Sequence, residues 1–137
     1  MVANLTRYLA DPFSAEITAL KLPDDMWELY QEFAQTMVGD EPDHRLMGIP
    51  SLVQNPMEKQ VALVSAGIFA GDGKAYSDPQ YESIRRTSVE WTLLLQIASD
   101  DENNVMWGDS GSLYVWIRKT DLATKRFDRC WVILQSY

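Results

Sequence analysis

Three stretches in the last third of the chain alternate apolar side chains with a period of two, and no other feature constrains the fold as strongly. The alternating apolar residues are Leu93, Leu95 and Ile97 in 91–98, Leu113, Val115 and Ile117 in 113–118, and Cys130, Val132 and Leu134 in 130–135. Successive side chains of a β-strand point to opposite sides, so each stretch predicts a strand with one apolar face. Strands this close together in the sequence favour a mostly antiparallel sheet.

The first half of the chain predicts helices. Pro23, Asp24 and Asp25 are typical of a helix start, because proline suits the first turn and carboxylates favour the positive end of the helix dipole. Apolar residues at helical spacing then predict one buried stripe on a helix that ends at Gly39. The stripe residues are Met26, Leu29, Tyr30, Phe33 and Met37.

Shorter helices are expected over 57–70, from Asp78 to Glu90, and over 120–127. Helices that come first and strands that come second favour an α+β fold over a doubly wound α/β fold. We therefore predict a single domain over 1–137, in which a mainly helical N-terminal half packs on a sheet formed by the C-terminal half. The segment 1–22 predicts no defined element.

The charge of the chain excludes some partners. Twenty carboxylates against twelve Lys and Arg give a net charge of −8, which repels phosphate backbones and anionic membrane surfaces. We expect neither a nucleic acid nor a membrane as partner. Cys130 is the single cysteine, so an internal disulfide is impossible and a reducing compartment, the cytoplasm, is expected.

The sequence Gly108-Asp109-Ser110-Gly111 is similar to the surroundings of the nucleophile in chymotrypsin-like serine proteases, with His44 upstream. Those enzymes have longer chains built from two β-barrels, and this chain is short and half helical. A tight turn before a strand is the better interpretation, with Asp109 binding backbone N–H groups and glycines at positive φ. We identify no catalytic residue from the sequence.

Four carboxylates, of Asp100, Asp101, Glu102 and Asp109, lie close enough in sequence to suggest a Ca²⁺ site. Their spacing does not match the EF-hand loop, so a solvated acidic turn is the preferred interpretation. His44 is the sole histidine, which leaves a histidine-based metal site incomplete within one chain. The sequence predicts neither a metal nor a cofactor.

Tyr114 and Trp116 occupy the strand face opposite Leu113 and Val115. If the aliphatic face packs on the helices, these aromatic side chains must meet another helix, a ligand or a partner. Coverage of both faces within the domain is the simpler interpretation, and an aromatic binding surface is the alternative.

Several segments, in this order and spacing, resemble the YwqG-like family of bacterial proteins, a domain of unknown function. The segments are 44–50 (HRLMGIP), 91–100 (WTLLLQIASD), Met106-Trp107-Gly108-Asp109 with Gly111, Leu113-Tyr114 with Trp116-Ile117, Phe127-Asp128, and 131–135 (WVILQ). The resemblance implies a fold and a bacterial origin, but no activity. Family members look longer, and this chain resembles their C-terminal half. A sheet that lacks the family's N-terminal strands would leave an exposed edge, which a second copy or another protein is expected to cover.

We therefore expect a non-enzymatic interaction module that acts through its sheet face and the loops 71–76 and 107–111, with a protein partner or a second copy of itself. One alternative is an enzyme or a small-molecule binder with a pocket around His44, Asp72 and Asp109. Another is an immunity-type protein that neutralises a basic toxin. The candidate binding residues are His44, Arg45, Asp72, Tyr76, Trp107, Asp109, Tyr114, Trp116 and Arg118. A deep polar pocket that gathers these residues would favour a ligand, and a flat apolar sheet face would favour a protein partner.

Overall fold

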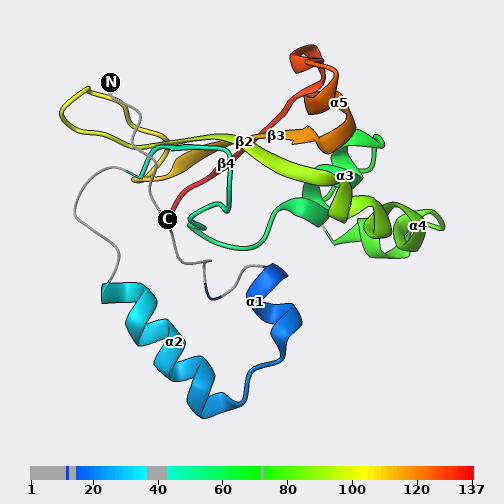
Figure 1. The fold of residues 1–137 in the computed structure, drawn as a ribbon. Helices are drawn as coiled ribbons and strands as arrows, with labels where there is room; N and C mark the ends of the chain where they lie inside the picture. The colour runs from blue at the N-terminus through cyan, green and yellow to red at the C-terminus, as the bar shows by residue number, and fades with distance from the viewer. Residues whose placement is uncertain (1–11, 13–14, 37–42, 72) are drawn as a thin grey trace.

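The computed structural model describes residues 12, 15–36, 43–71 and 73–137. Its four strands form one antiparallel sheet in the order β1-β2-β3-β4, which confirms the α+β class (Figure 1). The strands are β1 (Arg45–Leu46), β2 (Trp91–Ala98), β3 (Ser112–Arg118) and β4 (Trp131–Gln135).

The described helices precede the three long strands, except for one short pair between β3 and β4. The α-helices are α1 (Ala15–Leu20), α2 (Asp24–Thr36), α3 (Glu58–Ser65), α4 (Tyr81–Arg85) and α5 (Lys119–Ala123), and the 3₁₀ segments are η1 (Lys74–Ser77), η2 (Arg86–Glu90) and η3 (Phe127–Arg129). The expected helices at 57–70, 78–90 and 120–127 are present but shorter or partly 3₁₀. At the start of α4 the Asp78 carboxylate accepts the backbone N–H of Gln80 at 2.8 Å, as its cap-like position predicts.

A β-bulge in β2 changes which side chains share a face. Leu93 pairs with Trp116 and Leu95 pairs with Val115, so the register shifts between the two leucines. Leu93 therefore points into the core, whereas Leu95 points to the other side of the sheet. The prediction that Leu93, Leu95 and Ile97 share one face is wrong, because one extra residue reverses the alternation after it.

The core lies on the aromatic side of the sheet. Tyr114 and Trp116 are buried there and pack, with their strand neighbours, against Met57 and Val61 at the start of α3. The face that carries these aromatic side chains is thus covered within the domain. The aliphatic face of β3 is turned away from α3.

The apolar stripe of α2 is not buried as the sequence predicts. Met26, Leu29 and Phe33 each expose more than half of their surface, and Met37 and Gly39 lie outside the described residues. In Figure 1, α1 and α2 stand apart from the sheet. The core face of the sheet is already covered by α3 and the residues before it, so the apolar stripe of α2 cannot pack there. None of the described helices is long and apolar enough to cross a membrane.

Three buried polar side chains, one from each long strand, hold the loop 51–55 on the core face. We call this loop the clamped loop. The amide oxygen of Gln96 accepts the N–H of Ser51 at 2.9 Å, and the hydroxyl of Tyr114 donates to the Ser51 carbonyl oxygen at 2.6 Å. The amide of Gln135 binds the other end of the loop in the same way, at 3.0 and 2.8 Å. These bonds all reach the backbone of the loop, and the side-chain amide of Gln54 adds one more to the carbonyl oxygen of Ser136 at 2.5 Å.

Candidate functional site

The side of the sheet opposite the core presents aliphatic side chains to solvent, and we call it the open face. Val132 and Leu134 of β4 are its most prominent members on the long strands, with 57% and 51% of their surfaces exposed. The short helix α5 rises above one end of the sheet, next to β3, and at that end Ile117 is fully buried (Figure 1). The open face consists of Leu46, Leu95, Ile97, Leu113, Val115, Val132 and Leu134. An exposed apolar surface of this kind is typical of a binding site.

The strand β4 also forms an edge of the sheet. It stands last in the strand order, so no strand among the described residues pairs with its outer side. Residues 131–135 contain neither a charged side chain nor a proline, which are the usual means of protecting an edge strand from pairing with another chain.

The thiol of Cys130 lies next to this edge. Partial burial raises the pKa of Cys130, and the nearby carboxylates of Asp128 and Asp121 raise it further. A raised pKa keeps the group in its thiol form at neutral pH, which is the opposite of what a nucleophilic cysteine needs.

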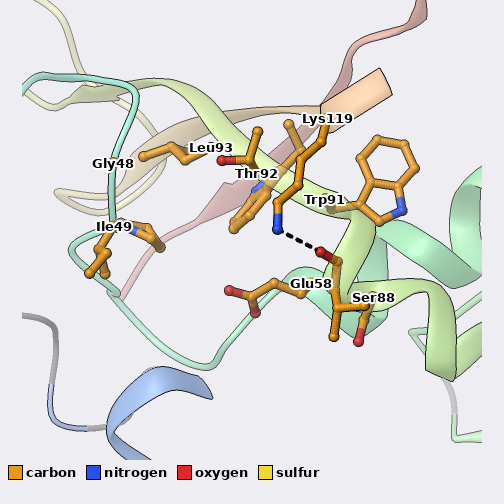
Figure 2. A pocket seen from close by; sticks show the side chains of 11 residues that line it. Gly48, Ile49, Glu58, Ser88, Trp91, Thr92, Leu93 and Lys119 are labelled. Atoms are coloured by element: carbon orange, nitrogen blue, oxygen red, sulfur yellow. Dashed lines mark hydrogen bonds between the residues drawn. The ribbon is translucent and has the colours of Figure 1, made fainter. Parts of the chain in front are cut away.

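A cavity of about 230 Å³ lies at the junction of β2, η2 and the loop 48–50. Figure 2 shows Lys119 and Glu58 at this cavity, with the Trp91 ring along its rim. The Lys119 ammonium donates to the carbonyl oxygen of Val89 at 2.8 Å, so its charge is already engaged. The volume lies below the roughly 300–1,000 Å³ of ordinary ligand pockets.

Two indole rings line this cavity, and neither offers its nitrogen to a ligand. Nε1 of Trp91 and Nε1 of Trp116 are buried and have no hydrogen-bond partner among the described residues. Because both nitrogens are shielded from solvent, they do not face a cavity that is open to solvent. The cavity therefore gives no clear signature of a ligand site.

A second cavity, of about 450 Å³, lies beside the clamped loop and is lined by Asp100, Asp101, Glu102 and Tyr137, among others. It contains the acidic turn that the sequence singled out. Among the described residues, no group of three or more His, Cys, Asp or Glu side chains is placed to hold a metal ion. The fourth carboxylate of the sequence cluster, that of Asp109, does not line this cavity.

His44 joins this acidic turn to β2. Its Nδ1 accepts the backbone N–H of Ala98 at 3.2 Å, and its Nε2 lies 3.3 Å from Oδ2 of Asp100. The proton of the neutral ring therefore sits on Nε2 and points at the carboxylate. No lone pair is left to act as a base, so the histidine has a structural role rather than the catalytic one that a protease-like motif would require.

Asp100 should make folding sensitive to acid. Hydrogen bonds lower the pKa of Asp100, above all the one from the side-chain amide of Asn103 at 2.5 Å, with a smaller contribution from His44. A depressed pKa in the folded state adds stability above the ordinary carboxyl pKa of about 3.9, and this stability is lost as the pH falls through the folded value. We expect Asp100→Asn to flatten the loss of stability below about pH 4, as measured by urea midpoints across that range. Asp101→Asn, an equal change of charge in the exposed part of the turn, should keep the wild-type slope; an unchanged slope in the Asp100 variant would contradict this.

The Gly-Asp-Ser-Gly motif forms a tight turn before β3, with φ of +62° and +48° at its first and third residues. The expected bonds from the Asp109 side chain are replaced by those of Ser99. The Ser99 hydroxyl accepts the N–H of Trp107 at 3.0 Å and donates to the carbonyl oxygen of Gly111 at 2.9 Å. The motif is thus a structural turn, and its sequence likeness to a protease carries no catalytic geometry.

The other candidate binding residues lie in separate places. Tyr76 is exposed in η1, where its ring packs on that of Tyr81 at 5.1 Å. The guanidinium of Arg118 lies 4.8 Å above the centre of the Trp91 ring and pairs with Glu90. These two sites are built from different elements and share no residue.

Arg45 is likewise occupied within the fold. Its guanidinium binds both carboxylate oxygens of Asp43 at 2.7 Å and the carbonyl oxygen of Ile49 at 2.6 Å. Asp72 lies outside the described residues, and Tyr114 and Trp116 belong to the core. Neither cavity is lined by any of the remaining candidates, which are His44, Arg45, Tyr76, Trp107, Asp109 and Arg118.

A comparison with known families shows which family the chain belongs to. A family model described as a domain of unknown function (DUF1963) matches residues 4–136. The chain belongs to this family. The match covers the segments quoted above and extends to the N-terminal helices of the DUF1963 domain. No curated protein matches the chain.

Two features of this DUF1963 domain were missed by sequence reasoning. The exposure of Val132 and Leu134 could have been read from β4, which has apolar side chains at every position but the last and so could not bury both faces as an edge strand. The hydrogen bonds that hold the clamped loop could have been anticipated from Gln96, the only amide side chain in the strand 91–98. Such a residue requires a buried hydrogen-bond partner.

Proposed function

We propose that this DUF1963 chain is a non-enzymatic interaction module that binds a protein surface through the open face of its sheet. One observation carries the proposal: Val132 and Leu134 stand exposed on an edge strand whose aliphatic face continues across β3. Burying a side chain of this size contributes about 1.5–3 kcal/mol, so leaving two of them in water favours a partner that covers them.

A protein partner is favoured over a small molecule by the shape of the surface. The open face is a sheet face, whereas the cavity beside β2 is small and its Lys119 ammonium is engaged. The candidate residues of the ligand alternative lie apart from one another, and His44 has no free lone pair. Nothing in the geometry of the described residues favours an immunity role.

The origin and location of the chain are part of the same proposal. The family is taken to be the YwqG-like group, and the chain to be bacterial and cytoplasmic. Support comes from the quoted segments between residues 44 and 135 and from the single cysteine, which suits a reducing compartment.

Capture from an extract of the source cells tests the role of the open face. The immobilised wild-type chain is expected to retain one or more proteins that Leu134→Lys retains at least about ten-fold less, because a lysine there cannot be buried against an apolar surface. Quantitative mass spectrometry of proteins and of small molecules measures the retention.

The matched control is Leu29→Lys, which places the same charge at an exposed leucine of α2. It should retain what the wild type retains. Equal retention by wild type and by Leu134→Lys, or retention of a small molecule alone, would refute a role for the open face. Circular dichroism of both variants confirms that each is folded.

A further inference from the structure

We propose that a second copy of the chain pairs with β4, so that the two β4 edges join antiparallel about a twofold axis. The inference goes beyond the proposed function, because it concerns the outer edge of β4 and leaves the open face available to the partner proposed above. The joined strands would make one continuous sheet of the two domains, with the open faces side by side. Pairing of this kind satisfies the backbone groups of both edges at once.

The sequence of β4 is compatible with pairing to itself. An antiparallel register centred on Ile133 places Val132 opposite the partner's Leu134 and Trp131 opposite the partner's Gln135. Every residue of the strand then has a counterpart, and no pair brings two charges together. A shift of the centre by one residue in either direction leaves strand residues without a counterpart. The register centred on Ile133 is therefore the one that pairs the whole strand.

The charges at the two ends of β4 complement one another in this arrangement. The strand follows residues 118–129, which carry five Lys or Arg against two Asp. Arg126 and Arg129 pair with Asp128 and Asp121, and the segment as a whole keeps a net positive charge. Its other end lies against the turn that holds Asp109, whose carbonyl oxygen accepts the N–H of residue 137 at 3.1 Å. The acidic residues Asp101 and Glu102 line the cavity at the same end.

An antiparallel pair brings the basic end of one β4 beside the acidic end of the other. Attraction at both ends offsets part of the repulsion between two copies that each carry a net charge of −8. A parallel pairing would instead set the basic ends together and the acidic ends together. The charge distribution thus selects the twofold, antiparallel arrangement.

A charge exchange on the open face tests the register. In V132K/L134K each lysine lies opposite a lysine of the partner, whereas in V132K/L134E each lysine lies opposite a glutamate. Both variants remove the same two aliphatic side chains. We expect the dimer dissociation constant of V132K/L134K to exceed that of V132K/L134E by about ten-fold or more. Sedimentation equilibrium measures both constants, and the wild type must be a dimer in the same experiment.

A disulfide provides a second test that does not depend on surface charge. The same register places Cys130 opposite the partner's Ser136, at the distance between paired strands that a disulfide requires. Ser136→Cys is therefore expected to form a dimer with two intermolecular disulfides on mild oxidation. Cys130→Ser combined with Ser136→Cys is the control and should stay uncrosslinked, because the two engineered thiols would then lie at opposite ends of the paired strands.

The outcomes separate this inference from the proposed function. A wild-type chain that stays monomeric at high concentration overturns the dimer, as do equal dissociation constants for the two charge variants. In either case, loss of a captured protein from Leu134→Lys would still support binding through the open face. If Leu134→Lys loses the dimer but retains the same proteins as the wild type, the role of the open face is overturned.

Discussion

Replacing Gly111 with alanine is expected to lower the free energy of unfolding by about 3 kcal/mol or more, the upper range for forcing extra atoms into a packed site. A β-carbon at this position would overlap the carbonyl oxygen of Gln135 and lie 2.6 Å from that of Trp107. Both obstacles are backbone atoms of the sheet and its entry turn, so neither can move aside without disturbing β4. Urea denaturation of the variant measures the loss.

The matched control for this prediction is Gly71→Ala. There the new β-carbon would lie 2.7 Å from the ring of Phe69, but that ring is exposed and can rotate away. We expect a change within about 0.5 kcal/mol, as for ordinary surface substitutions. A loss at Gly111 no larger than that at Gly71 would show that the turn and β4 are not held together as the structure places them.

The packing of Gly111 explains the protease-like sequence without catalysis. The last glycine of the motif is required because the turn approaches the end of β4 too closely for any side chain. The first takes a φ of +62°, which favours glycine. The residues between them, Asp109 and Ser110, are exposed, so the motif owes its shape to the backbone.

The strands were predictable from the sequence, but the side of the sheet that each residue faces was not. Period-two alternation located β2, β3 and β4 to within one or two residues. The bulge in β2 falls within Leu93-Leu94-Leu95. Three identical apolar side chains in succession fit either register equally well, so the pattern contains no information about where the alternation reverses.

The choice of core face depended on hydrogen bonds that are distant in sequence. Aliphatic side chains are the expected core of a strand, yet in β3 the buried side carries Tyr114 and Trp116. The Tyr114 hydroxyl can be buried because the clamped loop, about sixty residues earlier, supplies its partners. A buried hydroxyl generally requires a hydrogen-bond partner, but no local sequence pattern shows which distant residue supplies it.

The helix α2 shows the complementary limit of periodicity. Spacing predicted a helix with one apolar stripe from Pro23 to Gly39, and a helix is present over Asp24–Thr36. Spacing cannot say what the stripe packs against, because that depends on which element reaches the core face first. The same limit applies to the site. An exposed edge was expected from the missing N-terminal strands of the family, but the sequence could not say that β4 would form it. The candidate polar residues, chosen by type, proved to lie apart.

The second large effect is expected at Gln96, whose amide fastens the start of the clamped loop to β2. Gln96→Leu keeps the size of the side chain but leaves the N–H of Ser51 and the carbonyl oxygen of Asp43 without the bonds they make now, at 2.9 and 3.0 Å. Both groups are partly buried, and a group that loses its partner in such a place costs about 1–3 kcal/mol, so we expect a loss of about 2–4 kcal/mol in the free energy of unfolding.

A local measurement distinguishes this effect from a general loss of packing. Hydrogen exchange of the Ser51 amide should accelerate more in Gln96→Leu than exchange of the β3 amides, because the loop is released while the sheet remains paired. Gln60→Leu, the same substitution on the exposed side of α3, should leave both the stability and the exchange of Ser51 unchanged within about 0.5 kcal/mol. If Gln96→Leu were equally neutral, water would have replaced the amide, and the clamped loop would owe its position to Tyr114 and Gln135 alone.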